Sequence, residues 1–143
     1  MQSTSRYDRQ IRLPMVGQQG QQRIANSRVA VLGCGALGTV AADILARAAV
    51  GLLRLIDRDV VEWTNLQRQS LFIEADAQAG RAKAEVACER LQLANSTIQY
   101  EPVVTDVTLD NITALLSGID LVIDASDNFA LRLLLNDYSL KHR

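Results

Sequence analysis

Short apolar runs alternate with longer segments of helical periodicity from residue 28 to the end of the chain. A short run rich in Val, Ile and Leu predicts a buried strand, and apolar residues spaced three or four apart predict a helix. Strands are predicted at 28–33, 52–57, 97–104 and 120–124. Helices are predicted at 36–49, 81–94, 106–116 and 128–141. Gly51 is expected to end the first of these helices as a C-terminal cap.

The order of these elements predicts the fold class. Strands that alternate with helices form right-handed βαβ units, which build a parallel sheet covered by helices. We therefore expect an α/β, Rossmann-like, doubly wound and mainly parallel sheet with helices on both faces, formed by residues 28–143. Residues 1–27, rich in Arg and Gln, are expected to be an N-terminal helical segment outside the sheet. Because no strand follows the last helix, we expect a fold truncated after its fourth strand, which is left as an edge.

Composition and charge exclude several classes of binding partner and site. The 143 residues include 15 Lys and Arg and 16 Asp and Glu, so the net charge of -1 predicts no nucleic-acid partner. We find neither an apolar run of about 20 residues nor an N-terminal signal-peptide core. No membrane span and a cytoplasmic location are therefore expected. Cys34 and Cys88 form no CxxC pair and His142 is the only histidine, so neither a disulfide nor a structural metal site is expected.

A glycine-rich loop joins the first predicted strand to the first long helix. Its sequence, Gly33-Cys34-Gly35-Ala36-Leu37-Gly38, matches the pattern G-x-G-x-x-G. Glycine lets the backbone turn tightly and approach a phosphate, and the following helix N-terminus offers free N–H groups to an anion. The loop therefore predicts a nucleotide site. A tight turn with close helix packing gives the same pattern, and the pattern alone does not separate NAD, FAD, SAM and ATP.

Asp57 ends the second predicted strand. An acidic side chain at this place in a dinucleotide-binding fold accepts hydrogen bonds from ribose hydroxyls, and it disfavours NADP, whose phosphate it repels. The alternative is a turn or capping aspartate, since Arg58 and Asp59 follow directly.

A long polar segment follows Asp57, where a dinucleotide enzyme usually enters a helix. It contains Asn65 and Arg68, and Lys83 stands near the start of the next predicted helix. A triphosphate is bound by such groups, since a guanidinium forms paired hydrogen bonds with phosphate oxygens and a lysine supplies a point charge. Nicotinamide chemistry needs neither. The alternative is that Arg68 and Lys83 are solvated surface charges.

The fourth predicted strand ends in Asp124-Ala-Ser-Asp-Asn128. Ligands of open parallel sheets bind outside the carboxyl ends of the strands. A carboxylate there, such as Asp127, suits Mg²⁺ on the phosphates, because this ion prefers hard oxygen ligands. Helix capping by Asp127 or Asn128 is an equal alternative.

Together these motifs resemble those of the ThiF/MoeB/HesA family, bacterial relatives of the ubiquitin-activating enzymes. The matching segments, in order, are Arg6-Tyr-Asp-Arg-Gln10, the glycine loop, Leu55-Ile-Asp57, Thr64-Asn-Leu-Gln-Arg-Gln69, Gly80-Arg-Ala-Lys83 and Asp124-Ala-Ser-Asp-Asn128. The resemblance implies ATP-dependent adenylylation of the C-terminal glycine carboxylate of a ubiquitin-like or sulfur-carrier protein. The carboxylate attacks the α-phosphate of MgATP and gives an acyl-adenylate and pyrophosphate. ATP and Mg²⁺ are the implied cofactors, and a homodimer is the implied assembly.

The resemblance also implies a role for each matching position. The glycine loop would lie under the nucleotide, Asp57 would hold the ribose, and Asp127 would bind Mg²⁺. The positions implied for nucleotide contact are Gly33, Gly35, Ala36, Gly38, Asp57, Asn65, Arg68, Lys83, Asp127 and Asn128. The implied catalytic set is Arg9, Arg68, Lys83 and Asp127, and Arg9 corresponds to an arginine that the family supplies across a dimer interface.

The chain departs from the family pattern in two respects. Ala36 stands where family members often have glycine. The chain also corresponds to the first half or slightly more of a family member, without the later strands, the paired CxxC zinc ligands and the thiol-bearing crossover loop. Full activity is therefore not expected of it, and neither Cys34 nor Cys88 is expected to carry a persulfide or thioester step. Two alternatives are an NAD-binding oxidoreductase domain and an inactive family fragment that acts in assembly.

Overall fold

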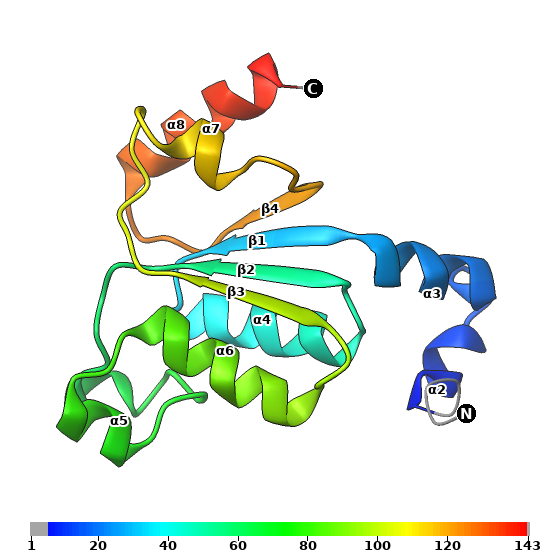
Figure 1. Ribbon diagram of the computed structural model, residues 1–143, viewed down its shortest axis with the longest axis horizontal. Helices are drawn as coiled ribbons and strands as arrows, with labels where there is room; N and C mark the ends of the chain where they lie inside the picture. Colours follow the sequence, from blue (N-terminus) through cyan, green and yellow to red (C-terminus); the bar gives the residue numbers. More distant parts are fainter. Residues whose placement is uncertain (1–5, 143) are drawn as a thin grey trace.

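The computed structural model describes residues 6–142 as a parallel sheet flanked by helices (Figure 1). The strands are β1 (Arg28–Leu32), β2 (Leu52–Ile56), β3 (Gln99–Val103) and β4 (Leu121–Asp124). Their order in the sheet is β3-β2-β1-β4, and every neighbouring pair is parallel. The predicted Rossmann-like fold is confirmed. The strand order reverses between β1 and β4, and ligands of such sheets bind beside this reversal, at the carboxyl ends of the strands.

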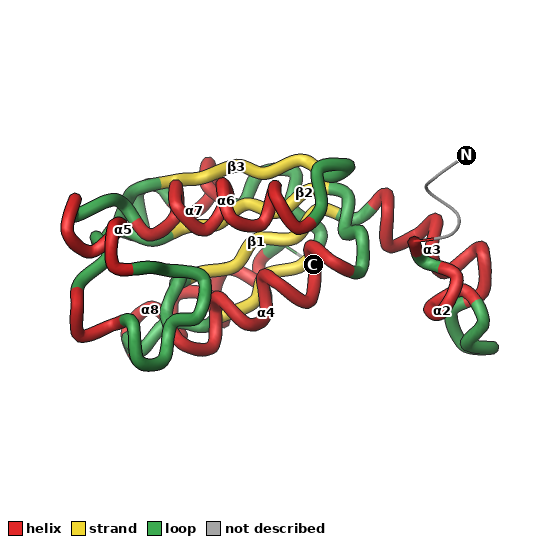
Figure 2. The backbone as a smooth tube through the Cα atoms, turned by 90° about the horizontal axis from the view of Figure 1, so that it is seen from below, coloured by secondary structure: helices red, strands yellow, loops and turns green. Residues whose placement is uncertain are grey.

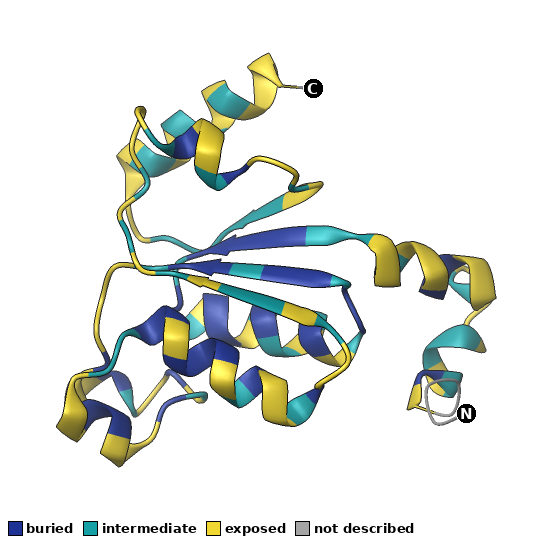
Figure 3. Cartoon of the chain, viewed as in Figure 1, coloured by how far each residue is buried: buried dark blue, intermediate teal, exposed yellow. Residues whose placement is uncertain are grey.

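Helices cover both faces of the sheet. On one face lie α4 (Ala36–Arg47) and α6 (Lys83–Ala94), and on the other lie α7 (Ile112–Leu115) and α8 (Phe129–Lys141) (Figure 1). Successive strand residues point to opposite faces, so Val29 and Val31 pack towards α4 and α6, while Ala30 and Leu32 pack towards α7 and α8. Because both faces of the central strands are buried, these strands read as nearly continuous apolar runs (Figure 3).

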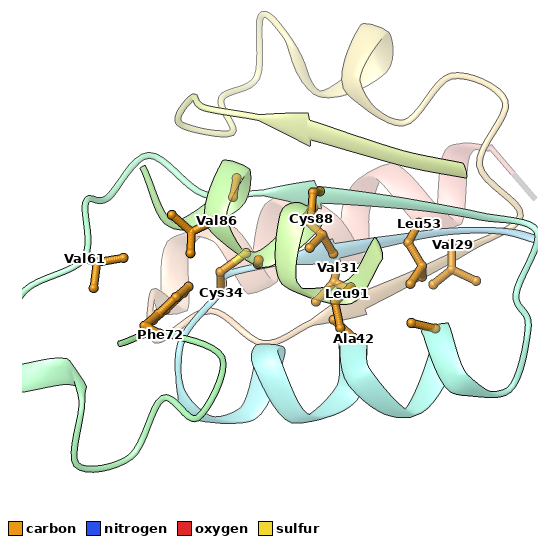
Figure 4. Packing of buried hydrophobic residues seen from close by; sticks show 14 of the residues in the cluster. Val29, Val31, Cys34, Ala42, Leu53, Val61, Phe72, Val86, Cys88 and Leu91 are labelled. Atoms are coloured by element: carbon orange, nitrogen blue, oxygen red, sulfur yellow. The ribbon is translucent and has the colours of Figure 1, made fainter. Parts of the chain in front are cut away.

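The larger of the two cores lies between the sheet and α4 and α6 (Figure 4). Fully buried Val31, Leu53 and Leu55 from the sheet pack there with Val86 and Leu91 from α6. The opposite core is smaller, and α8 has no fully buried residue. The glycine loop and the start of α4 are therefore fixed on the better-packed side of the sheet.

Three sequence-based boundaries need correction. The stretch 58–78, expected to be irregular, contains the short helices η1 (Trp63–Asn65) and α5 (Glu74–Ala79). The helix expected at 106–116 is the much shorter α7, because the Asn111 side chain accepts from the Thr108 amide and holds the preceding residues in a turn. The cap expected at Gly51 is wrong, since α4 ends at Arg47 and the left-handed residue beyond it is Ala49, with φ 68°.

The N-terminal segment lies beyond the amino ends of the parallel strands (Figures 1 and 2). It contains the helices α2 (Asp8–Ile11) and α3 (Gly17–Asn26). The division of the chain into an N-terminal segment, residues 1–27, and a nucleotide-binding domain stays a prediction. Residues 1–5 lie outside the described range. Among the helices of residues 6–142, none is long and apolar enough to cross a membrane.

Candidate functional site

A cleft of about 650 Å³ opens at the carboxyl ends of β1, β2 and β4. Every position predicted to contact the nucleotide lines it, except Gly38: the lining includes Gly33, Gly35, Ala36, Asp57, Asn65, Arg68, Lys83, Asp127 and Asn128. These residues come from five separate segments of the chain. The fold therefore brings together, at the place where open parallel sheets bind ligands, side chains that are far apart in sequence.

The glycine loop forms one wall of the cleft and carries two different constraints. Gly33 has a φ of +94°, which disfavours any residue with a side chain, and it lines the cleft. Gly38 is buried in α4, and a Cβ on it would lie 1.7 Å from the Gly33 carbonyl oxygen. Gly38 thus lets α4 pack against the loop. The close-packing interpretation is correct for Gly38, whereas Gly33 and Gly35 face the cleft.

Asp57 connects the glycine loop with the polar segment that follows β2. Its Oδ2 accepts a hydrogen bond from the Cys34 amide at 2.6 Å, and its Oδ1 accepts one from the Asp59 amide at 2.7 Å. Asp57 is therefore a turn residue and a cleft residue at once. A carboxylate offers about four lone-pair sites, so two remain for groups in the cleft.

Lys83 is a buried cation at the floor of the cleft, not a solvated surface charge. Its residue is only 6% exposed, and its Nζ lies 3.6 Å from Asp59 Oδ2. Its backbone amide donates to the Asp59 carbonyl at 2.9 Å, which fixes the start of α6 against the loop after β2. Asp59 is itself exposed, so this pair is half solvated.

The segment 62–69 folds around Asn65. Its buried side chain accepts a hydrogen bond from the Glu62 amide at 2.9 Å. The backbone carbonyl of Asn65 accepts from the Arg68 and Gln69 amides. Arg68 is exposed, and its guanidinium donates to the Thr64 carbonyl at 2.9 Å. Asn65 thus shapes the wall, and Arg68 presents a charged group at its rim.

Gln69 lines the cleft although sequence reasoning gave it no role. It is 3% exposed, and its Oε1 is buried without a hydrogen-bond partner among residues 6–142. A buried acceptor without a partner is rare in native proteins and marks a place where a water or a bound donor completes the bonding. In the sequence, the only indication of a role for Gln69 was its place in the Asn65–Gln69 motif.

The end of β4 separates two roles that the sequence left open. Asn128 caps α8, since its side chain accepts from the Leu131 amide at 3.3 Å. The Asp124 carboxylate accepts hydrogen bonds from the amide and the hydroxyl of Ser126. It also forms an ion pair with Arg132, whose Nε lies 3.5 Å from Asp124 Oδ2. Asp127 is exposed at the cleft and makes no hydrogen bond or ion pair with another residue of the range 6–142.

The carboxylates suit a magnesium ion that is bound mainly by phosphates. Within residues 6–142 no group of three or more His, Cys, Asp or Glu side chains could hold a metal ion. Mg²⁺ in nucleotide sites is commonly held by one or two carboxylates together with phosphate oxygens and waters. Asp127 fits that role as a single free carboxylate.

Neither cysteine has the properties of a nucleophile. Burial raises the pKa of the Cys34 thiol well above its ordinary value, and the Asp57 carboxylate raises it further. Burial also raises the pKa of Cys88 to about 12, with a smaller contribution from Glu89. Both thiols are therefore protonated at neutral pH and lack the thiolate that nucleophilic or metal chemistry requires.

Arg9, the remaining predicted catalytic residue, does not reach this cleft. It is exposed on α2, which lies beyond the opposite end of the sheet (Figure 1). The chain therefore gathers Arg68, Lys83 and Asp127 in one site and holds Arg9 elsewhere.

The ThiF family model matches residues 7–143. The chain belongs to the ThiF family. It is 43% identical over 138 residues to the sulfur carrier protein ThiS adenylyltransferase of Bacillus subtilis, covering 96% of this chain and 41% of that protein. It is 45% identical over 132 residues to the SAMP-activating enzyme E1 of Haloferax volcanii, covering 92% of this chain and 48% of that protein.

Solved structures of ThiF-type proteins have the same fold. TcdA (CsdL) matches with a TM-score of 0.89 at 34% identity, over 97% of this chain and 56% of that one. The E. coli tRNA N6-threonylcarbamoyladenosine dehydratase TcdA in complex with ATP matches with a TM-score of 0.80 at 36% identity, over 87% of this chain and 50% of that one. The chain thus spans about half the length of these ThiF-family relatives.

Proposed function

We propose that this chain is the nucleotide-binding portion of an ATP-dependent adenylyltransferase that activates the C-terminal glycine carboxylate of a ubiquitin-like or sulfur-carrier protein. The observation that carries the proposal is the convergence of the glycine loop, Asp57, Asn65, Arg68 and Lys83 on one cleft. The ThiS-activating and SAMP-activating relatives and the ATP complex of TcdA support it. A cytoplasmic location is part of the same proposal.

In this proposal the nucleotide lies across the glycine loop. The amide groups at the start of α4 face the anion, and Asp57 accepts hydrogen bonds from the ribose hydroxyls with its remaining lone pairs. Gln69 Oε1 offers a further acceptor to a donor group of the nucleotide. The negative charge of Asp57 favours an unphosphorylated ribose over a 2′-phosphate.

The triphosphate would extend towards Lys83, Asn65 and Arg68. The ammonium of Lys83 would attract a phosphate more strongly than a surface charge does, because the Lys83 residue is buried and little water screens it. Mg²⁺ would be held by Asp127 and the phosphates, and when bound it neutralises phosphate charge. These groups stabilise the charge that develops as the carrier's carboxylate oxygen attacks the α-phosphorus and pyrophosphate leaves.

Arg9 would act in trans within a homodimer. In its own chain it lies beyond the opposite end of the sheet from the cleft, so only a second copy could bring it to a nucleotide. A guanidinium placed over the phosphates would add charge neutralisation that the exposed Arg68 alone does not provide. The dimer and this role of Arg9 are both parts of the proposal.

Carrier-dependent exchange of pyrophosphate into ATP tests the proposed reaction. The chain is incubated with MgATP, labelled pyrophosphate and the ThiS protein of Bacillus subtilis, because the matching relative activates a protein of that name. Label is expected to enter ATP only when the carrier is present, and more slowly than with the full-length Bacillus subtilis adenylyltransferase, of which the match covers 41%. A carrier that lacks its C-terminal glycine is the matched control and should give no exchange. Exchange without the carrier would contradict the proposal. A lack of exchange with the intact carrier would contradict it as well.

A further inference from the structure

The four residues of helix α2 (Asp8–Ile11), which carries Arg9, are not themselves buried, so the helix is held in place by the residues around it. The segment that follows exposes Leu13 and Met15. A helix this short is not stable on its own. Its position must therefore come from contacts with the body of the domain.

The first anchor is Tyr7, whose residue is only 9% exposed. The side chain of Asn95, 1% exposed, donates to the Tyr7 hydroxyl at 2.9 Å and to the Ala46 carbonyl at 2.7 Å. The Thr97 hydroxyl donates to Asn95 Oδ1 at 2.8 Å, which leaves the Tyr7 hydroxyl to donate to Thr97 at 3.4 Å. Arg6 donates to the same Asn95 oxygen at 2.7 Å. Every polar atom of the buried Asn95 side chain is thus bonded.

The second anchor is Gln10, at the other end of α2. Its Nε2 donates to Gln21 Oε1 at 2.7 Å and to the Ala48 carbonyl at 3.3 Å, and Gln21 donates to the same carbonyl at 3.1 Å. Ala48 is the C-cap of α4, and the last carbonyls of a helix have no partner within it. Gln10 and Gln21 therefore complete the end of α4 and tie α2 and α3 to it.

Arg9 lies between these two anchors and takes part in neither. It is exposed and makes no hydrogen bond or ion pair within the range 6–142. We propose that Tyr7, Gln10, Gln21 and Asn95 are positioning residues, which hold α2 against the ends of α4 and α6 so that Arg9 is presented in a fixed place to the cleft of a second copy. The task assigned to Arg9 rests on the proposed function. The anchoring of α2 does not.

Amide hydrogen exchange with mass spectrometry tests the anchoring without any activity. The amides of Ile11 and Arg12 donate to the carbonyls of Tyr7 and Asp8 and report on α2. Tyr7→Phe is expected to speed their exchange roughly tenfold or more while exchange in β1 and β2 is unchanged. Tyr138→Phe removes a hydroxyl from α8 and is the matched control. Unchanged exchange at α2 in Tyr7→Phe, or unprotected amides there in the wild type, would overturn the proposal.

Mixed dimers test the positioning role separately. When a Lys83→Ala chain pairs with an Arg9→Ala chain, only one of the two clefts has an intact Lys83 and an intact Arg9, and this Arg9 comes from the Lys83→Ala chain. Tyr7→Phe placed in that chain is expected to lower carrier-dependent exchange on the order of tenfold, and the loss is expected only in that arrangement. Equal losses with Tyr7→Phe in either chain would overturn the positioning role. No exchange by the wild type would contradict the proposed function, and hydrogen exchange would still decide the anchoring.

Discussion

The Cys34 amide donates a hydrogen bond to Asp57 Oδ2 across 2.6 Å and so fastens the glycine loop to the end of β2. The second oxygen of the same carboxylate receives the Asp59 amide at 2.7 Å. Asp59 in turn lies 3.6 Å from the ammonium of Lys83. One carboxylate therefore fixes two walls of the cleft, and the buried cation is placed relative to both.

Asp57→Ala is expected to weaken MgATP binding by roughly tenfold or more, because it removes charged hydrogen bonds that are each worth about 1.5–3 kcal/mol. Titration calorimetry measures the change. Asp120→Ala is the matched control, since Asp120 also accepts a backbone amide, that of Arg28 at 2.8 Å, but at the opposite end of the sheet. An equal effect of the two variants would show that Asp57 acts through general stability.

Lys83→Met is expected to abolish most catalysis while leaving the fold in place. The methionine keeps the apolar stem, and the lost ion pair with exposed Asp59 is worth no more than about 1 kcal/mol of stability. Carrier-dependent pyrophosphate exchange is expected to fall on the order of 100-fold, as for other removed charge-stabilising groups. Lys141→Met on exposed α8 is the control. Exchange at the wild-type rate by Lys83→Met would show that Lys83 has no catalytic role.

Gly38→Ala is expected to lower the free energy of unfolding by about 2 kcal/mol or more, because its new methyl group would lie 1.7 Å from the Gly33 carbonyl oxygen. Gly35→Ala is the control, since the nearest atom to its methyl group, Gln69 Nε2, would be 3.9 Å away. Urea denaturation compares the two variants. A Gly38→Ala protein as stable as the Gly35→Ala protein would contradict the close packing of α4 on the loop.

Stability is expected to decline in mild alkali through the buried thiols. Burial raises the pKa of Cys88 from its ordinary 9.0 to about 12 in the folded chain. A group with a raised folded-state pKa contributes fully below the unfolded pKa, and this contribution falls as pH rises from 9 towards 12. Urea denaturation from pH 8 to 11 should show a loss of up to about 1.4 kcal/mol per pH unit for this thiol. The decline should be shallower in Cys88→Ala, and an identical slope would refute the assignment.

The strands and the glycine loop could be predicted because their signals are local. Strands buried on both faces read as apolar runs, and Gly33 stands directly where β1 ends. Helix α5 was missed because its sequence, EADAQA, has no apolar stripe. It is held instead by Asp76, which accepts the Ile73 amide and lies 3.1 Å from Arg90 of α6. That second contact depends on the tertiary fold.

The sequence predicted several of the residues that line the cleft, but not the structural role of each one. Gln67 is exposed and Gln69, two positions later, is buried in the cleft wall, and nothing in the residue type separates them. Likewise the sequence offered Asp127 and Asn128 equally as cap and as ligand. Only the geometry of β4 and α8 assigns the cap to Asn128 and leaves Asp127 free at the cleft.

Titration calorimetry of the chain with MgATP, and separately with NAD, tests the central claim most directly. The account predicts saturable binding of MgATP at one site, with NAD bound at least roughly tenfold more weakly, a difference of about 1.4 kcal/mol. That preference is expected because Lys83 and Arg68 line the cleft where we propose that the triphosphate lies. A nicotinamide has no group that would pair with these two cations. Binding of NAD without binding of MgATP would contradict the account and identify the cleft as a dinucleotide site.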